Sequence, residues 1–430
     1  MSGVLLRRIM QDHGTAPRLR PQMPDYAYAA VLDIAACGTV ACGTHEEVCD
    51  HCGDRRQVAN TCGNRACPLC QGAARARWVA NRDAELLPVS YAHIVFTVPA
   101  ELRALLAAFP RVGYGLLMRA AASAVLWLAA QDKYLGAEVG IISVLHTWTR
   151  DLGLHPHVHL LVTAGGWQEE AGRWVDAPLA RRRGARGFFL PVAALRAAFQ
   201  RRFRRLLLQA YAAGDFHRDA TLAGMFPCLA STAAFRRFLD GLLTKRWCIR
   251  IEPPSGSPEI LLRYLGRYIN RVAIGPGRIT AYDGATVTFD AKGDTCTLPA
   301  PEFVRRFARH VLPPGFVRIR FSGIWSTRHR SAKLDAARAW LAAHGRRRAP
   351  PPDDGAPTAT RTATTMPPPI ITTPLARPAV PVGDPCPHCG RGTYRRRPGG
   401  HRPPRAERQR LLRLMLAGQL PTPGGVTIPA

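Results

Sequence analysis

The sequence predicts an α+β fold, an antiparallel or mixed sheet with flanking helices, preceded by a small N-terminal zinc-binding domain. Short apolar runs rich in branched residues alternate with longer segments of helical periodicity, and one segment has the pattern of a hairpin. Seven of the 12 cysteines fall between residues 37 and 70, ahead of these segments. Strands mixed with helices and a hairpin are typical of an α+β layer, and a compact cysteine cluster is typical of a metal-bound module.

The individual strands and helices follow from apolar patterning and from the residues that end each run. Strands are expected over residues 93–98, 140–148, 157–164, 247–252 and 317–325, and the fourth should stop at Pro253 and Pro254. Helices are expected over residues 192–211, 259–273 and 301–311, the first with a strongly basic face. Residues 278–290 should form the hairpin, because Asp283-Gly284 is a favourable two-residue turn.

Composition divides the chain into five regions. Residues 1–36 are expected to be a helical lead-in, 37–72 the zinc-binding domain and 73–345 the main globular domain. Residues 346–385 are rich in Pro and Thr and poor in large apolar residues, so we expect a disordered linker. Residues 386–430 form a basic tail. Its Cys386 and Cys389, near His388 and His401, make half a metal site, and a disordered tail is favoured over a degenerate zinc ribbon.

The charge balance indicates a polyanionic partner. The chain holds 59 Lys and Arg against 30 Asp and Glu, a formal charge of +29, and nucleic acid is the commonest partner of such a surplus. The first residues lack the charged start and long apolar run of a signal peptide. The longest apolar region, residues 102–130, is interrupted by Pro110, Arg111 and Arg119, so we expect no membrane span and a cytoplasmic protein.

The cysteine cluster predicts one or two structural Zn²⁺ ions. It contains two Cys-x-x-Cys pairs, and the tight knuckle between such paired cysteines directs both sulfurs toward one ion. In a long chain without an export signal, clustered pairs hold metal more often than they form disulfides. Eight residues are candidate ligands, enough for two tetrahedral sites, and their grouping stays open: Cys37, Cys42, His45, Cys49, Cys52, Cys62, Cys67 and Cys70.

Three histidines within five residues predict a second kind of metal site. Side chains alternate between the faces of a strand, so His157 and His159 point the same way while Val158 enters the opposite layer. Buried polar groups need partners, which favours metal binding over two core or solvent-facing histidines. The third ligand stays open among several candidates: His155, which shares the parity, His146, Asp151, and a carboxylate or amide from elsewhere in the chain.

Two tyrosines lie four residues apart in the helix expected over residues 259–273. This spacing places Tyr264 and Tyr268 on one helix face. Phenol is a weak nucleophile because its pKa is about 10, and a nearby cation or guanidinium would favour the phenolate and neutralise a phosphate under attack. Alone, the pair would be packing residues; together with the histidines it predicts nucleophiles. A parallel stripe of guanidinium groups is expected to contact DNA phosphates: Arg263, Arg267 and Arg271.

Ordered motifs along most of the chain resemble one family. They include His-Pro-His-Val-His at 155–159, Tyr-Leu-Gly-Arg-Tyr-Ile-Asn-Arg at 264–271, Cys49-Asp-His-Cys52-Gly, Cys62 to Gln71, His146-Thr-Trp, and the segments that begin at Phe188, Val311 and Arg328. Together they resemble the rolling-circle insertion-sequence transposases of the two-tyrosine His-hydrophobic-His nuclease class, the insertion sequence ninety-one family. Ala66 stands where that family usually has His, and the unusual Cys42 is a candidate replacement ligand.

The resemblance implies a function and its parts. His157 and His159 would hold Mg²⁺ or Mn²⁺ against the scissile phosphate of single-stranded DNA. Tyr264 or Tyr268 would attack that phosphate, leaving a 5′-phosphotyrosine and a free 3′-hydroxyl. The partner would be DNA, as element ends and target, in a prokaryotic nucleoid; the order of the tyrosines and the oligomeric state stay open. The alternatives are a replication initiator or relaxase-like nickase and a non-catalytic zinc-dependent DNA-binding regulator.

Overall fold

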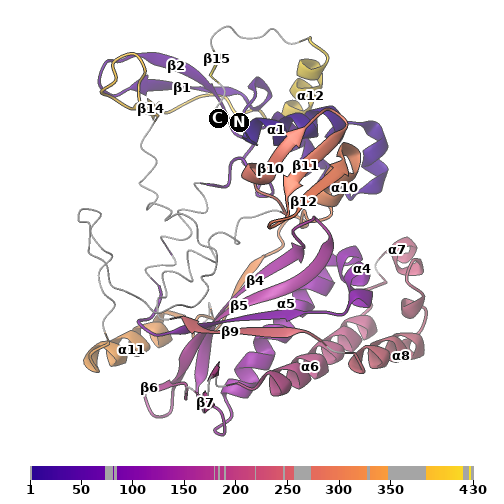
Figure 1. Ribbon diagram of the computed structural model, residues 1–430, viewed down its shortest axis with the longest axis vertical. Coiled ribbons are helices and arrows are strands. Elements are labelled where there is room, and N and C mark those ends of the chain that lie inside the picture. Colours follow the sequence, from indigo (N-terminus) through magenta and orange to yellow (C-terminus); the bar gives the residue numbers. More distant parts are fainter. Residues whose placement is uncertain are drawn as a thin grey trace.

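A six-stranded antiparallel sheet lies at the centre of the molecule, for which we use a computed structural model (Figure 1). The structure describes residues 2–72, 81, 85–178, 180–182, 185–187, 190–217, 219–245, 247–255, 273–326, 330–346, 384–419 and 426–427. The strand order is β13-β4-β5-β3-β9, and β6 extends the sheet beside β5. These strands span Ile319–Gly323 (β13), Glu138–Trp148 (β4), Leu154–Gln168 (β5), Tyr91–Thr97 (β3), Ile249–Ser255 (β9) and Arg173–Asp176 (β6).

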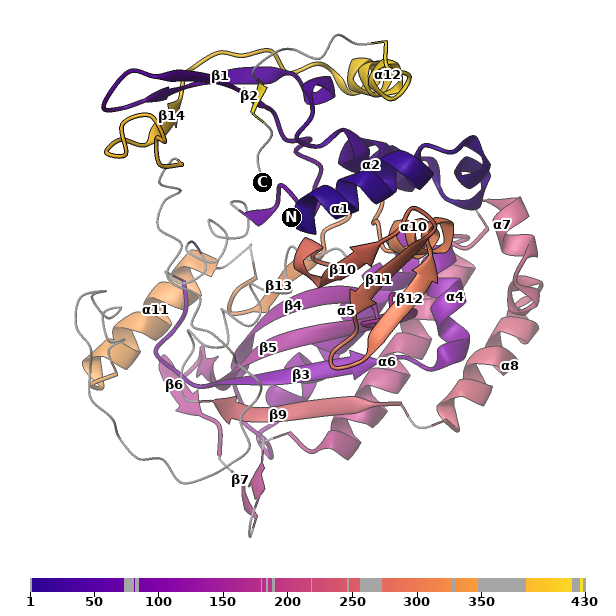
Figure 2. The same cartoon turned by 45° about the horizontal axis from the view of Figure 1, so that its top comes forward.

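Helices cover one face of this sheet (Figure 2). Val158 and Leu160 of β5 and Leu145 of β4 point into this layer and join its apolar core. The helix α5 has the length and apolar composition of a membrane span, but 61% of its apolar window is buried, as in a core helix. The covering helices are α4 (Ala100–Ala108), α5 (Pro110–Ala129), α6 (Val192–Ala212), α7 (Ala220–Gly224) and α8 (Thr232–Leu243), with the short turn η4 (Pro227–Leu229).

Within the described part of the chain, two packed regions lie on the opposite face of the sheet. At one end, α11 (Arg330–Ala343) packs with Trp325, Tyr91 and Leu161 in a smaller apolar core. At the other end lies a module built from the start of the chain and residues 273–311, with its own core. The histidine-bearing part of β5 lies between these two packed regions.

The N-terminal module is larger than the cysteine cluster alone. The lead-in contains α1 (Ser2–Ile9), η1 (Met10–Gly14), η2 (Pro17–Gln22) and α2 (Asp25–Ala36). A three-stranded meander, β10 (Ile279–Tyr282), β11 (Thr286–Asp290) and β12 (Thr295–Pro299), packs on it with α10 (Ala300–Ala308) and the turn η5 (Pro276–Arg278). Residues 273–311 therefore share a core with the lead-in, although the sequence assigned them to the main domain.

A second small sheet joins the two ends of the chain. Its order is β14-β1-β2-β15, with β1 (Thr44–Cys49) and β2 (Arg55–Ala59) from the cysteine cluster and β14 (Tyr394–Arg396) and β15 (Val426–Thr427) from the tail. The helix α12 (Arg405–Leu416) follows β14 and buries Leu412 in the module core; the turn η3 (Val40–Cys42) also contacts it. The favoured prediction of a disordered tail is thus wrong for residues 384–419.

The observed strands overlap the predicted ones: β4 and β5 extend beyond their predictions, β3 and β9 are shifted, and β13 is shorter. The predicted hairpin at 278–290 is present, and the side chain of Asp283 accepts hydrogen bonds from the backbone N–H groups of Ala285 and Thr286 at its turn. The expectation that Pro253 and Pro254 stop a strand is wrong, because β9 continues to Ser255. This strand is an edge of the sheet, where a proline removes no ladder hydrogen bond on its open side. The short pair β7 (Ala180–Arg182) and β8 (Ala185–Gly187) was not predicted.

Candidate functional site

Three imidazoles meet on the face of the central sheet opposite the covering helices. His157 and His159 lie on β5, and His146 on the neighbouring strand β4 is the cross-strand partner of His157. Their ligand nitrogens all lie within 4.8 Å of one another, and the ring centroids of His146 and His159 are 4.4 Å apart. Alternation along β5 and direct pairing with β4 therefore bring three neutral-nitrogen donors to one point, which is the donor set of a divalent metal site.

Hydrogen bonds orient two of these rings. The Nδ1–H group of His157 donates to the carbonyl oxygen of His155 at 2.6 Å, which leaves Nε2 as the ligand atom. Nδ1 of His159 lies 2.8 Å from Nε2 of His93, and Nδ1 of His93 lies 2.8 Å from a carboxylate oxygen of Glu252. With neutral rings, Glu252 accepts from His93, His93 accepts from His159, and Nε2 of His159 keeps its lone pair.

The burial of the histidines favours their uncharged, metal-binding form. Burial lowers the pKa of His157 to about 4. The hydrogen bond to the backbone of His155 opposes this shift, and the nearby rings of His155 and His93 add to it. Burial also lowers the pKa of His159 well below its ordinary value. The pKa of Glu252 is lowered because its carboxylate accepts a hydrogen bond from His93. Near neutral pH His157 and His159 are thus uncharged and able to act as ligands, and the carboxylate of Glu252 is charged.

The structure narrows the open question of the third ligand. Among the described residues, His146 completes the imidazole group, whereas His155 and Asp151 lie outside it. The register of β4 and β5 shifts beyond the His146 and His157 pair, which moves His155 out of line. The carboxylate of Asp151 instead accepts a hydrogen bond from the hydroxyl of Thr149. Sequence alone named His146 only as one candidate, because strand register is not visible there.

The predicted nucleophiles lie outside the described residues. This holds for Tyr264 and Tyr268 and for the basic stripe of Arg263, Arg267 and Arg271. The structure does describe Ser255 and Ala273, which flank this segment in the sequence. Ser255 pairs with Tyr91, beyond the far end of the histidine cluster along the sheet. Ala273 lies near the turn between β4 and β5, where Arg278 contacts the carbonyl oxygens of both Ala273 and Arg150.

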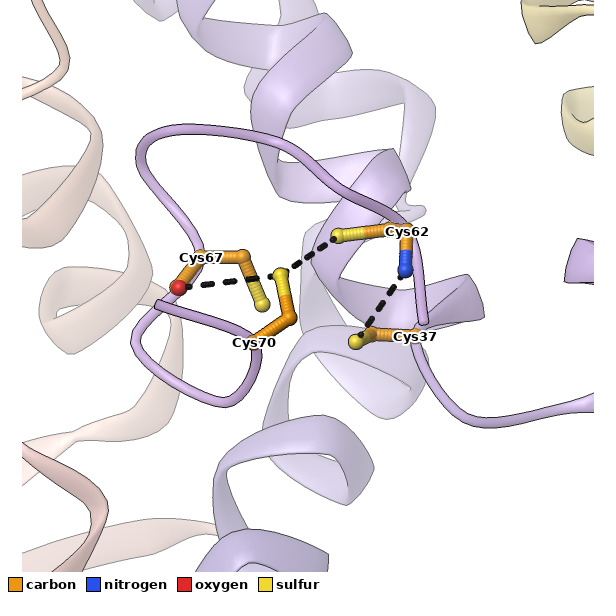
Figure 3. A group of neighbouring side chains, drawn as sticks. All are labelled: Cys37, Cys62, Cys67 and Cys70. Atoms are coloured by element: carbon orange, nitrogen blue, oxygen red, sulfur yellow. Dashed lines mark hydrogen bonds between the residues drawn. The ribbon is translucent and has the colours of Figure 1, made fainter. Parts of the chain in front are cut away.

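Four of the eight predicted zinc ligands form one group, shown in Figure 3. Cys37 directly follows α2, and Cys62, Cys67 and Cys70 come from the loop after β2, with their sulfurs turned toward one another. The Cys62 and Cys70 sulfurs are 3.8 Å apart, and the backbone N–H of Cys62 donates to the Cys37 sulfur at 3.4 Å. Hydrogen bonds with the thiols of Cys62 and Cys67 lower the pKa of Cys37. This group fits a structural Zn²⁺ ion.

The remaining predicted ligands are arranged differently from the expectation. The thiol of Cys42 donates to the carbonyl oxygen of Ala36 at 3.1 Å, and burial raises its pKa to about 12, so it stays a thiol. His45 lies between Asn60 and Glu47. Ala66 is buried beside a complete four-sulfur group, so its lack of an imidazole removes no ligand and Cys42 replaces none. Cys49 and Cys52 lie instead with Cys386 and Cys389 of the tail.

Comparison with known proteins identifies the family to which the chain belongs. The family model described as "Putative transposase" matches residues 140–333, which hold the histidine cluster, and the model described as "Transposase zinc-binding domain" matches residues 9–98. A Sinorhizobium fredii protein named "Putative transposase y4qJ" is 38% identical over 345 residues, covering 78% of this chain and 84% of the relative. The transposase for insertion sequence element IS801 of Pseudomonas savastanoi is 29% identical over 313 residues, covering 71% of each chain.

No solved structure matches this protein. The two family models match in the order in which the structure places a cysteine-rich module and a histidine-bearing sheet. The first relative is matched over most of its own length, so the likeness is not confined to one motif. The chain belongs to the family of IS91-type insertion-sequence transposases.

Proposed function

We propose that this transposase cleaves and rejoins single-stranded DNA at the ends of its element through a 5′-phosphotyrosine intermediate. The observation that carries the proposal is the group formed by His146, His157 and His159, oriented by hydrogen bonds on a rigid sheet. A divalent cation held there, Mg²⁺ or Mn²⁺, would withdraw charge from the scissile phosphate. Membership of a transposase family implies DNA binding and strand transfer in general; the tyrosine chemistry is our inference.

The tyrosines and arginines have different roles in one transesterification step. The phenolic oxygen of Tyr264 or Tyr268 attacks phosphorus, the bond from phosphorus to the 3′ oxygen breaks, and that oxygen leaves as a 3′-hydroxyl after taking up a proton. The number of phosphoester bonds does not change, so no nucleotide cofactor is consumed. Arg263, Arg267 and Arg271 would neutralise the phosphates, and the second tyrosine could receive the second strand. The placement of Ser255 and Ala273 on either side of the histidine cluster supports this assignment.

A single-strand cleavage assay tests the proposal. End-labelled single-stranded DNA from the element ends, incubated with the purified protein and Mn²⁺, should give a nick and a protein–DNA adduct that survives denaturation. Replacing both Tyr264 and Tyr268 by Phe should abolish the adduct and leave DNA binding intact. A matched control is Tyr282→Phe, since Tyr282 donates to Asp12 in the N-terminal module and lies on β10.

The alternatives give different outcomes in the same assay. A non-catalytic regulator would bind the DNA and give no nick with any metal. If the adduct formed undiminished in the double Phe variant, the tyrosine assignment would be wrong while the metal site could stand. If His157→Ala left cleavage and its Mn²⁺ dependence unchanged, the imidazole group would have no part in the reaction.

A further inference from the structure

The second four-sulfur group joins residues from both ends of the chain. Cys49 and Cys52 flank the turn after β1, and Cys386 and Cys389 precede β14. The Cys49 and Cys389 sulfurs are 3.7 Å apart, as are those of Cys52 and Cys386, although 334 residues separate the latter pair in sequence. Neither family model extends to residues 386–389, so the zinc-binding match at residues 9–98 contains only half of this group.

The two halves of the group have the same local structure. Each is a Cys-x-x-Cys-Gly segment in which the glycine N–H donates to the carbonyl oxygen of the first cysteine, at 3.2 Å for Gly53 and 2.9 Å for Gly390. Both glycines have positive φ, 75° and 64°, a conformation that other residues adopt at a cost. Backbone N–H groups of His51, Cys52 and Gly392 donate to cysteine sulfurs. Such knuckles hold sulfur atoms as thiolate ligands rather than as packing thiols.

Contacts around the sulfurs hold the two halves together. The strands β1 and β14 pair antiparallel, with Cys49 opposite Tyr394. The carboxylate of Asp50 accepts from the backbone N–H of Thr393 at 2.7 Å and from its hydroxyl at 3.0 Å. Arg56 contacts Asp384 at 2.5 Å and lies 4.0 Å from the ring centroid of Tyr394. Strand pairing and side-chain contacts therefore position the tail against β1. These contacts hold the four sulfur atoms close together.

We propose that Cys49, Cys52, Cys386 and Cys389 bind a second structural Zn²⁺ ion, which fastens the C-terminal tail to the N-terminal module. Four thiolates are a ligand set that zinc prefers in structural sites, and the two knuckles bring their four sulfurs within 4.8 Å of one another. The tail helix α12 lies beside the first sulfur group, where Arg408 contacts the carbonyl oxygen of Cys62 at 3.5 Å. The second ion thus fixes a segment that covers the first site.

Metal analysis with matched variants tests this site. Wild-type protein should carry two thiolate-bound metal ions per chain, and Cys386→Ser with Cys389→Ser should carry one. Loading with Co²⁺ separates the thiol groups from the histidine cluster, because only thiolate ligands give sulfur-to-cobalt charge-transfer absorption. This absorption should fall by about half in the double variant, since it removes one of two four-thiolate sites. Cys248→Ser, at an exposed cysteine outside both groups, should change nothing.

Alkylation of the wild-type chain tests the site without a variant that could misfold. Cys52 and Cys248 are both exposed, so their accessibility alone predicts similar reaction with a maleimide. Zinc bound to the second group should protect Cys52 and Cys389 at least about tenfold relative to Cys248, and a chelator should remove the protection. The proposal is overturned if zinc-loaded protein contains one thiolate-bound ion or if Cys52 reacts as fast as Cys248. Neither readout depends on DNA cleavage, so the two proposals can fail separately.

Discussion

The two kinds of candidate metal centre in this protein are built in opposite ways. The histidine cluster lies on β4 and β5, whose backbone is fixed by strand pairing and by apolar packing beneath it, so the fold positions the ligands. The thiol groups lie on loops and knuckles next to short strands and a helix end, and each group brings together cysteines from segments that are apart in the sequence. At the thiol groups, a bound metal ion is expected to hold the fold together. At the histidine cluster, the fold itself positions the candidate ligands.

The strongest test of this contrast removes ligands from each kind of centre. Structural zinc contributes about 10–16 kcal/mol in small zinc modules, comparable to or larger than the whole stability of a domain. We expect Cys62→Ser with Cys67→Ser to unfold the N-terminal module, seen as loss of its thermal transition and rapid proteolysis. His157→Ala with His159→Ala should keep the wild-type transition and lose Mn²⁺ binding. Equal stability of the two double variants would contradict the contrast.

A buried histidine joins the two regions and should make their coupling depend on pH. His310 follows α10, and its ring lies 3.1 Å from the hydroxyl of Thr147 and 3.1 Å from the carbonyl oxygen of Leu152, at the turn between β4 and β5. Burial lowers the pKa of His310 to about 4. The unfolded chain, with its ordinary pKa of about 6.5, binds a proton first as the pH falls. The stability from this ring is therefore complete above pH ~6.5 and is lost toward pH ~4, about 3 kcal/mol in all.

Replacing this ring by an amide isolates its contribution. His310→Gln offers one acceptor and one donor in its place and does not titrate. Urea unfolding between pH 7.5 and 5 should show the wild type losing about 2 kcal/mol more than the variant. Both proteins keep the cysteine groups and the histidine cluster. Their response to acid is therefore the same in both proteins and does not contribute to the difference between the two stability changes. Parallel pH profiles would mean that the buried ring takes no part in joining the module to the sheet.

The sequence predicted the histidine cluster because its chemistry is local. A two-residue period places His157 and His159 on one face of a strand, whatever the rest of the chain does. His146 required the register of two strands, and the site of Cys49 and Cys52 required a partner 334 or more residues away. A half-site at Cys386 and Cys389 was visible in the sequence. Its partner, Cys49 and Cys52, could not be identified, because the composition of the intervening residues does not show which part of the fold the tail packs against.

The same reasoning explains why the sequence did not predict which core residues 273–311 join. The hairpin at residues 278–290 was predicted from its turn residues, but patterning does not say which core an amphipathic segment joins. Phe289 and Phe303 are fully buried against the lead-in helices rather than against the central sheet. Pro253 and Pro254 were expected to end β9 because proline usually interrupts a strand. The edge position of β9 in the sheet, which the sequence does not show, makes them compatible with strand pairing.

A smaller effect is expected from a carboxylate behind the imidazole site. Glu252→Gln keeps an acceptor for His93 and removes the charge that orients the relay to His159. Changes to such supporting groups lower metal affinity by about 10–100-fold, so we expect weaker Mn²⁺ binding in a titration followed by electron paramagnetic resonance. The thermal transition should not move. Glu138→Gln is the matched control, because Glu138 begins β4 and pairs with Lys333 at 2.7 Å.

The outcome of that titration bears directly on the contrast between the centres. If the sheet alone positioned His159, the affinity of Glu252→Gln would equal that of the wild type. If the variant instead lost stability together with affinity, the histidine site would resemble the thiol groups in supporting its own fold. If Glu252→Gln binds Mn²⁺ more weakly and its thermal transition is unchanged, then Glu252 and His93 act by positioning the ring of His159.

The smallest expected effect lies in the tail interface. Asp33 is buried and contacts three partners: Arg405 at 2.9 Å, Arg408 at 3.3 Å and Asn64 at 2.7 Å. Arg405 is half exposed, so Arg405→Ala removes a solvent-screened partner from a carboxylate that keeps the other two, at a cost below about 1 kcal/mol. Amide exchange of α12 should then quicken by no more than about fivefold, because zinc and the packing of Leu412 still hold the helix. A loss of protection as large as that caused by removing Cys386 and Cys389 would mean that ion pairs, rather than a metal, fasten the tail.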